Sequence, residues 1–398
     1  MRIRRDGSAA PGQSAVTVVA NDVGTIGGME GQLKELVAEL LNRRWHVTVI
    51  ARTCLVPSHP QLQWVRVPGP GRPFSIAFPW FALCASILLW RRGRGIVHTT
   101  GAIVANRSDL STVHLCHAGI STKTDLVRAR STALHYRING LLGARMSRAA
   151  ERWCYRPGIT RLLVTVSKGA ADEIGHHFPA MRGAVAVIPN SVDAHRFRPN
   201  PEARERVREE LSLAPDAFVV LFVGGDWERK GLAVAIRAVA RVQRSHLVVV
   251  GAGDTHRFRR IAEETRVGDR THFVGVIGHV QDLYAAADVF LLPSRYETFS
   301  MVTYEAAATS LPLLVTRVSG VEEILVDGVN GRYITCDPEA IAERLRTLRD
   351  DTHLRTSMGA KSRDLASHFA QTNMVDRYEE LYRRLHSPSA PGLGATRP

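Results

Sequence analysis

Two glutamates eight residues apart, Glu297 and Glu305, mark the segment of the chain with the most specific chemistry. The segment follows a buried-strand pattern and opens a helical pattern. If Ser300 is the N-cap of that helix, the amides near Phe299, Ser300 and Met301 remain available, because the first turn of a helix has no internal acceptors for them. A helix start of this kind is a binding site for phosphate groups, and here it would suit a diphosphate.

The two carboxylates lie on either side of this helix start. Glu305 comes one turn into the helix, and helical side chains lean toward the N-terminus, so its carboxylate is expected to accept hydrogen bonds from two ribose hydroxyls. Glu297 precedes the helix and is placed to reach a transferred sugar. The alternative is a solvated acidic loop followed by an exposed helical glutamate.

A second loop supplies cations. Gly224–Gly231 reads GGDWERKG and follows another buried-strand pattern. Glycines after a strand let the backbone approach phosphate, and Arg229 and Lys230 would neutralise its charge. The alternative is an ordinary strand-to-helix loop with surface charges.

A third glycine-rich stretch lies near the N-terminus, where Gly27 and Gly28 separate a strand pattern from a helix pattern. Their backbone is expected to approach phosphates from a second domain. The spacing is not the G-x-G-x-x-G of dinucleotide-binding folds, and no acidic ribose-binding residue ends the next strand. A nicotinamide cofactor is therefore disfavoured, and no cofactor is expected.

Strand and helix patterns alternate along the whole chain, which predicts an α/β protein with parallel sheets covered on both faces. A length of 398 residues fits two such domains. The predicted organisation begins with a disordered tail at 1–13 and an N-terminal Rossmann-like domain at 14–193, which binds the acceptor. A C-terminal Rossmann-like domain at 194–370 binds the nucleotide sugar. A C-terminal helix at 371–387, which can return to the N-terminal domain, and a second disordered tail at 388–398 complete the chain.

The net charge of +14 comes entirely from the first half of the chain, because residues 1–192 hold 24 Lys/Arg and 10 Asp/Glu whereas residues 193–398 hold 28 of each. Such asymmetry favours an anionic partner, a membrane surface or an acidic glycan, while no nucleic-acid recognition motif is found. The five cysteines lack metal-ligand spacing, and the N-terminus lacks the apolar stretch of a signal peptide. We expect a cytoplasmic protein with no transmembrane helix.

The combined motifs resemble the group 1 family of retaining glycosyltransferases, which have the GT-B fold of two Rossmann-like domains facing a central cleft. The resemblance rests on Pro293–Glu297 through Glu305–Ala308, on Gly320–Ile324 and Asp327–Arg332, and on the turn Val187–Asp193. It extends from about residue 15 to 385. The order Arg229–Lys230–Gly231 is closest in style to lipopolysaccharide-core glucosyltransferases.

The resemblance implies a role for each matching residue. Lys230 would bind the donor diphosphate, Glu305 the ribose, and Glu297 the donor sugar at the reacting carbon. Where many family members carry arginine, this chain has Gly225, and Arg229 is expected to supply the missing cation.

Three histidines of the first domain are candidates for contact with the ligand. His98 and His117 are expected to end strands, at the sheet edge where such folds bind ligand. His117 best matches the family histidine that approaches the donor sugar, and His114 is a rival. The alternative is a satisfied core or loop histidine.

The expected reaction is metal-independent sugar transfer from a nucleotide diphosphate with retention of configuration, since no Asp-x-Asp motif is present. A UDP-sugar is favoured over a GDP-sugar, and the acceptor would be a glycan or lipid-linked molecule of cell-envelope polysaccharide, lipopolysaccharide or glycolipid synthesis. A nucleotide-sugar epimerase of the same fold and a non-catalytic nucleotide-sugar or polyanion-binding protein are the alternatives.

The stretch 74–94 carries tryptophans on an apolar segment that ends in Arg91, Arg92 and Arg94. It is expected to form a helix, and two interpretations of it stay open. The helix could contact the inner face of the cell membrane through anionic lipid headgroups, or it could pack on the first sheet with a basic C-terminal end.

Overall fold

The computed structural model describes residues 14–24, 27–119 and 134–386, so both predicted tails lie outside the described residues. The chain forms two compact units. The first comprises residues through Pro189 together with residues from Thr372 onward, and the second runs from Asn190 to Gln371. The boundary falls four residues before the predicted one at Asp193, because the last strand of the first sheet ends at Val187 and Val192 already pairs with Ala370 of the second unit.

The first unit is built on seven parallel strands in the order β5-β3-β1-β6-β7-β8-β9. Its central strands are almost entirely buried on both faces, which is typical of a parallel sheet covered on both sides. A short pair, β2 (Asp22–Val23) and β4 (Thr53–Cys54), lies beside it. The seven strands are β1 (Ala15–Val19), β3 (His46–Ala51), β5 (Leu62–Arg66), β6 (Ile96–Thr100), β7 (Ser108–Val113), β8 (Thr160–Thr165) and β9 (Val185–Val187).

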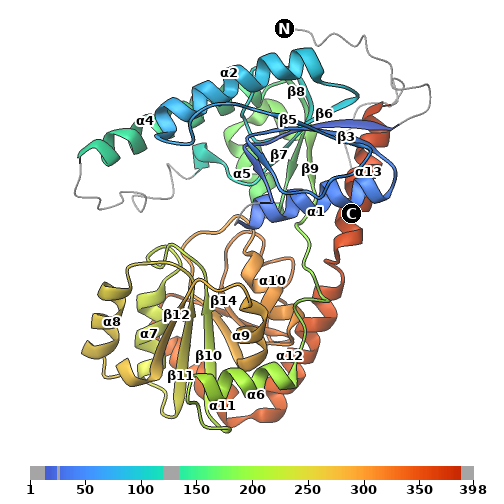
Figure 1. The fold of residues 1–398 in the computed structure, drawn as a ribbon. Coiled ribbons are helices and arrows are strands. Elements are labelled where there is room, and N and C mark those ends of the chain that lie inside the picture. The colour runs from blue at the N-terminus through green and yellow to red at the C-terminus, as the bar shows by residue number, and fades with distance from the viewer. Residues whose placement is uncertain (1–13, 25–26, 120–133, 387–398) are drawn as a thin grey trace. The chain divides into compact units, whose positions relative to one another are not determined.

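Helices cover both faces of this sheet (Figure 1). The side chains of α1 and α13 share one apolar core with alternate strand residues such as Val18 and Val164. On the other face α2 packs on Val19 and Ile50, while α5 packs on Leu163. The helices of this unit are α1 (Gly28–Asn42), α2 (Phe74–Arg92), α4 (Leu134–Cys154), α5 (Lys168–His177) and α13 (Gln371–His386), with a 3₁₀ turn at Pro179–Ala184.

The C-terminal helix α13 is tied into the first unit by a buried polar chain through His98. The ring nitrogens of His98 bond the Tyr382 hydroxyl at 2.7 Å and the Thr112 hydroxyl at 2.8 Å, and Thr112 in turn bonds the Tyr378 hydroxyl at 2.9 Å. Burial lowers the pKa of His98 to about 3, with a smaller effect from His114. His98 lies within β6 and is a satisfied core histidine, so its expected place at a ligand-binding strand end is wrong.

The second unit repeats the design with six parallel strands in the order β12-β11-β10-β13-β14-β15. The strands are β10 (Phe218–Val223), β11 (Ser245–Val250), β12 (Thr271–Gly275), β13 (Val289–Leu292), β14 (Leu313–Thr316) and β15 (Gly331–Ile334). The helices are α6 (Pro201–Glu210), α7 (Leu232–Ala240), α8 (Thr255–Glu264), α9 (Val280–Ala286), α10 (Met301–Ala308), α11 (Pro338–Asp350) and α12 (Thr352–Ser367), with a 3₁₀ turn at Gly268–Arg270.

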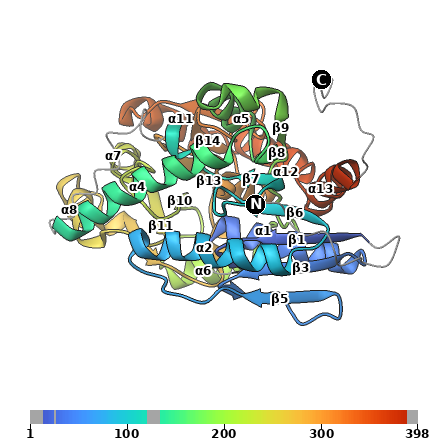
Figure 2. The ribbon, with the colours of Figure 1, turned by 90° about the horizontal axis from the view of Figure 1, so that it is seen from above.

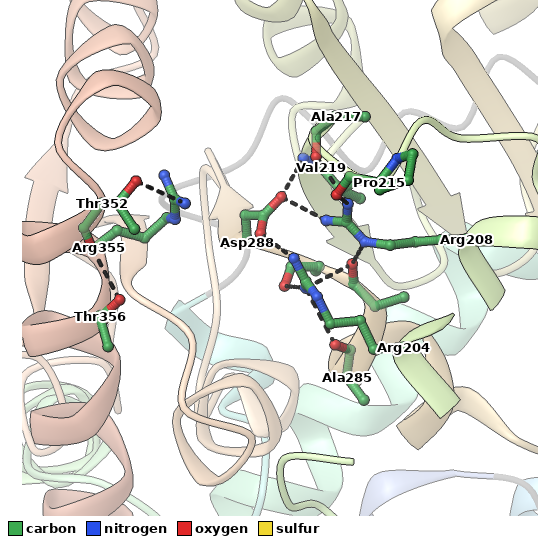
Figure 3. Close-up of polar contacts among 12 residues, drawn as sticks. Arg204, Arg208, Pro215, Ala217, Val219, Ala285, Asp288, Thr352, Arg355 and Thr356 are labelled. Atoms are coloured by element: carbon green, nitrogen blue, oxygen red, sulfur yellow. Dashed lines mark hydrogen bonds and ion pairs between the residues drawn. The ribbon is translucent and has the colours of Figure 1, made fainter. Parts of the chain in front are cut away.

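A buried ion cluster fixes the start of β13, the strand that leads to α10. Asp288 accepts hydrogen bonds from Arg208 at 2.8 Å, from Arg204 at 2.7 Å and from the Val219 amide at 2.7 Å (Figure 3). Asp288 and Arg208 are both nearly excluded from solvent. Removing one partner of such a pair leaves an uncompensated buried charge, which typically costs about 3–5 kcal/mol of stability. The cluster therefore joins α6, β10 and β13 into one rigid support.

Candidate functional site

The helix α10 begins at Met301 with Ser300 as its N-cap, as the sequence predicts. The Ser300 hydroxyl does not cap a backbone amide but bonds the Thr303 hydroxyl at 2.8 Å. The Thr303 amide donates to the Ser300 carbonyl at 2.8 Å, and the amides of Met301 and Val302 have no acceptor within the helix. No side chain therefore caps the start of α10, which is the positive end of the helix dipole, and this favours binding of an anion there.

The turn before α10 is held by aromatic packing. The Phe299 ring stacks on Tyr304 with 4.4 Å between centroids, and the Tyr304 hydroxyl donates to the Gly320 carbonyl at 2.5 Å. Gly320 has a φ of 84°, and a Cβ there would lie 2.7 Å from the Cα of Phe299. A side chain at 320 would therefore displace the turn that presents the amides.

The loop between β10 and α7 is anchored by Trp227. Its indole nitrogen donates to the Gly224 carbonyl at 2.8 Å, and its ring packs edge-on against Phe258. Gly224 has a φ of 143°, and a Cβ at that position would lie 2.5 Å from the Cδ and Cε atoms of Lys230. Because Gly224 has no side chain, the Lys230 side chain can lie directly against it.

The cations of this loop meet Glu297. Lys230 Nζ lies 2.7 Å from Glu297 Oε1, Arg229 Nη1 lies 3.2 Å from the same oxygen, and the Ser294 hydroxyl donates to it at 2.9 Å. Burial alone would raise the pKa of Glu297, but Lys230 and Arg229 outweigh it and hold the pKa below its ordinary value. The three charged residues form one cluster, although the sequence analysis assigned Lys230 and Glu297 to different parts of a ligand.

Glu305 bonds a residue that the sequence analysis did not identify. The hydroxyl of Tyr284, on α9, donates to Glu305 Oε2 at 2.7 Å, and Tyr284 is fully buried. Burial raises the pKa of Glu305, while the Tyr284 hydrogen bond and the charges of Arg196 and Lys230 oppose that rise. Glu305 is therefore oriented by a neighbouring helix and interacts electrostatically with the Lys230 cluster.

His117 lies past the end of β7 rather than on it, because the strand ends at Val113. The Glu151 carboxylate accepts the amides of His117 and Ala118 at 2.7 and 3.1 Å, which turns the chain into a helical segment. Burial lowers the pKa of His117, with a contribution from Arg148, and it lowers the pKa of His114 to about 4. The placement of His117 as a strand end is wrong, and its role remains a prediction.

The first unit holds a cavity of about 600 Å³ where β3 and β5 end. Arg52 and Arg66 line it together with Asp22, which bonds Arg52 at 2.5 Å. The Nε atom of Arg52 is buried and has no hydrogen-bond partner among the described residues. This cavity was not predicted from the sequence.

Gly27 lies elsewhere in the unit, as the N-cap of α1 before Gly28, and the phosphate contacts predicted for both remain predictions.

Two family models match the chain, one over the part that forms the first sheet and one over the part that forms the second. Residues 26–196 match the model of Glycosyltransferase Family 4, and residues 217–351 match that of Glycosyl transferases group 1. A D-inositol 3-phosphate glycosyltransferase of Streptomyces avermitilis is 32% identical over 239 residues, which is 56% of this chain and 51% of the relative. The chain thus spans about half the length of the curated relatives it matches.

Two solved structures share the fold over nearly their whole length. The crystal structure of WaaG, a glycosyltransferase involved in lipopolysaccharide biosynthesis, superimposes with a TM-score of 0.77 at 21% identity and covers 92% of this chain and 99% of WaaG. HepE of Anabaena in complex with UDP-glucose gives a TM-score of 0.69 at 16% identity, covering 92% and 98%. With two parallel-sheet units of the GT-B type and both domain models matched in order, this chain belongs to the group 1 glycosyltransferase family.

Proposed function

We propose that this protein is a retaining glycosyltransferase that moves a sugar from a nucleotide diphosphate sugar, with a UDP-sugar favoured over a GDP-sugar. The acceptor would be a glycan or lipid-linked molecule of cell-envelope polysaccharide or glycolipid synthesis. The observation that carries this proposal is the meeting of Lys230, Arg229 and Glu297 directly before the uncapped start of α10. Cations and a helix N-terminus at one place suit a diphosphate.

The chemistry would be leaving-group stabilisation. The bond between the anomeric carbon and the terminal phosphate oxygen breaks, and the electron pair leaves with the diphosphate. The acceptor oxygen bonds the same carbon from the same face, and its proton passes to the departing diphosphate. Lys230, Arg229 and the first amides of α10 would hold the growing negative charge, and such preorganised contacts are the largest contribution to many enzymatic rates. In this proposal the side chains and amides do this work without a metal ion.

The other donor contacts follow from the geometry around α10. Glu305, oriented by Tyr284, would accept hydrogen bonds from the ribose hydroxyls, and Glu297 would face the transferred sugar once the diphosphate draws Lys230 away from it. The likeness to HepE, whose structure contains UDP-glucose, supports a UDP-sugar, and the likeness to WaaG supports a role in the cell envelope.

A donor panel tests the proposal. We expect UDP-sugars to raise the melting temperature of the protein more than GDP- or ADP-sugars, because a ligand that binds only the folded state stabilises it. With the best donor and a matching acceptor, NMR of the product should show the anomeric configuration of the donor. A product that is only an epimer of the free nucleotide sugar, or the absence of any thermal shift, would contradict the proposal.

We further propose that the cavity at the ends of β3 and β5 receives an anionic group of the acceptor, such as a phosphate. The carboxyl ends of parallel strands are where open α/β sheets bind ligands. Arg52 and Arg66 both line the cavity, and Asp22 offsets only one of the two positive charges, so the lining keeps an excess of positive charge that favours an anion.

Replacing Arg52 with alanine should raise the KM for the acceptor at least about tenfold, since a lost charged hydrogen bond is worth about 1.5–3 kcal/mol. Donor binding should be unchanged, because Lys230, Glu297 and Glu305 lie in the other unit and Arg52 is not among the predicted donor contacts. Arg161→Ala is the matched control: it is an arginine at the opposite, amino-terminal edge of the same sheet. Equal acceptor KM values for the two variants would count against this cavity.

We propose that the protein is cytoplasmic, with peripheral contact on the inner face of the cell membrane. The basic first half of the chain supports that contact.

A further inference from the structure

The outward face of α2 is apolar along its whole length. Ile76, Trp80, Leu83 and Ile87 are 57, 47, 58 and 42% exposed, and steps of four, three and four residues place them on one side of the helix. The opposite side, through Ala77, Phe81, Ala85 and Leu89, is buried against the sheet of the first unit. The helix α2 is therefore apolar both on the face that packs against the sheet and on the exposed face.

The helix α4 extends this exposed apolar surface. It lies beside α2 (Figures 1 and 2), where the Ser75 amide donates to Asn139 Oδ1 at 3.1 Å and the Phe74 ring packs close to Gly143. Leu141 and Leu142 of α4 are 65 and 43% exposed. Soluble monomers seldom expose a large contiguous apolar patch unless it binds a partner.

The charges around this surface have one sign. Arg91, Arg92 and Arg94 are exposed where α2 ends, and Arg145 and Arg152 are exposed on α4. The sequence of 74–94 contains no aspartate or glutamate, and that of α4 contains only Glu151, which is buried. An apolar face flanked by arginines matches a bilayer with an apolar interior and anionic headgroups.

We propose that α2 and α4 together form a docking surface for a bilayer that contains anionic phospholipid. This inference extends the membrane contact named above and does not depend on the identity of the sugar donor. The helix α2 is long and apolar enough to cross a membrane, with a mean hydropathy of 1.5, but its other face is packed on the sheet. It therefore lies along the membrane surface.

The docking surface adjoins the proposed acceptor cavity. The indole nitrogen of Trp80 donates to the Pro68 carbonyl at 3.0 Å, and its ring covers Gly69, both of which line that cavity. Tryptophan is favoured at the membrane interface, where its ring is buried and its N–H is satisfied. A lipid-linked acceptor would reach the cavity from the bilayer without crossing open solvent.

Vesicle co-sedimentation of the full-length protein tests the proposal. Wild type should bind vesicles of phosphatidylglycerol and phosphatidylcholine but not vesicles of phosphatidylcholine alone. Two variants should each bind at least about tenfold more weakly: the apolar variant Ile76→Ser, Leu83→Ser, Ile87→Ser and the charge variant Arg91→Glu, Arg92→Glu, Arg94→Glu. The three apolar side chains are exposed, so their loss should leave the melting temperature close to that of wild type.

The matched control is Val276→Ser, which removes a side chain 67% exposed in the second unit and should leave vesicle binding unchanged. All variants should bind nucleotide sugar like wild type, so failure of this proposal is distinguishable from failure of the donor site. Equal vesicle binding by wild type and both variants would overturn the proposal. So would a wild-type dimer in gel filtration that the apolar variant dissociates, with no binding of wild type to vesicles.

Discussion

Replacing Lys230 with alanine is expected to lower kcat/KM at least about a hundredfold, the scale of losing one preorganised charge contact in the transition state. Lys230 is the cation of the β10–α7 loop that lies closest to Glu297, at 2.7 Å, and it is nearly excluded from solvent. Its removal takes a positive charge from the diphosphate and leaves Glu297 with Arg229 as its charged partner. Steady-state kinetics with varied donor measure the effect.

Folding must be separated from chemistry in this variant, because breaking a buried ion pair also destabilises a protein. Thermal unfolding gives the temperature at which the variant remains folded, and kinetics are compared below it. Lys361→Ala is the matched control, since Lys361 is an exposed lysine of the same unit and should have no effect on rate. A Lys230→Ala enzyme that is folded and as active as wild type would refute the assigned diphosphate site.

Replacing Glu305 with alanine is expected to have a comparable effect, again at least about a hundredfold in kcat/KM. Two hydrogen bonds to a charged carboxylate are worth about 1.5–3 kcal/mol each, and about 1.4 kcal/mol corresponds to a factor of ten. The loss should appear mainly as weaker donor binding, measured by calorimetry with UDP-glucose. Unchanged binding by the variant would show that Glu305 does not contact the nucleotide.

The pH dependence of donor binding distinguishes the carboxylate from a merely space-filling side chain. Burial raises the pKa of Glu305, so protonation begins at a higher pH than for a free glutamate. Ribose hydroxyls bind the ionised form, so UDP-glucose affinity should fall as the pH decreases from neutrality through that raised pKa. Glu305→Gln should bind weakly with little dependence on pH in this range. The diphosphate of UDP-glucose is esterified at both ends and does not itself titrate there.

The sequence predicts most interior strands because they are apolar runs that are buried on two faces of a covered sheet. The run Phe218–Val223 is buried along its whole length, and it is the strand pattern that precedes Gly224 in the sequence. Two edge strands are not predicted by this pattern. Leu62–Arg66 is largely exposed, and Gly331–Ile334 is short and opens with glycine, so neither has the apolar pattern of a central strand.

The start of α10 is also predictable from sequence, because N-caps and helix onsets depend on local residues. Contacts between distant segments are not. Lys230 and Glu297 are 67 positions apart, and Tyr284 reaches Glu305 from a different helix. The family motifs place these residues near one ligand but do not show that they bond each other. The cavity beside Arg52 arises from loops after two strands, one of which the sequence analysis did not identify.

The most direct test of the central claim is a crystal structure of the protein with bound UDP-glucose. The account predicts diphosphate oxygens about 2.7–3.2 Å from Lys230 Nζ and from the backbone amides near Phe299, Ser300 and Met301. The ribose hydroxyls should lie at Glu305. A diphosphate bound away from the start of α10, with Lys230 still paired only to Glu297, would contradict it.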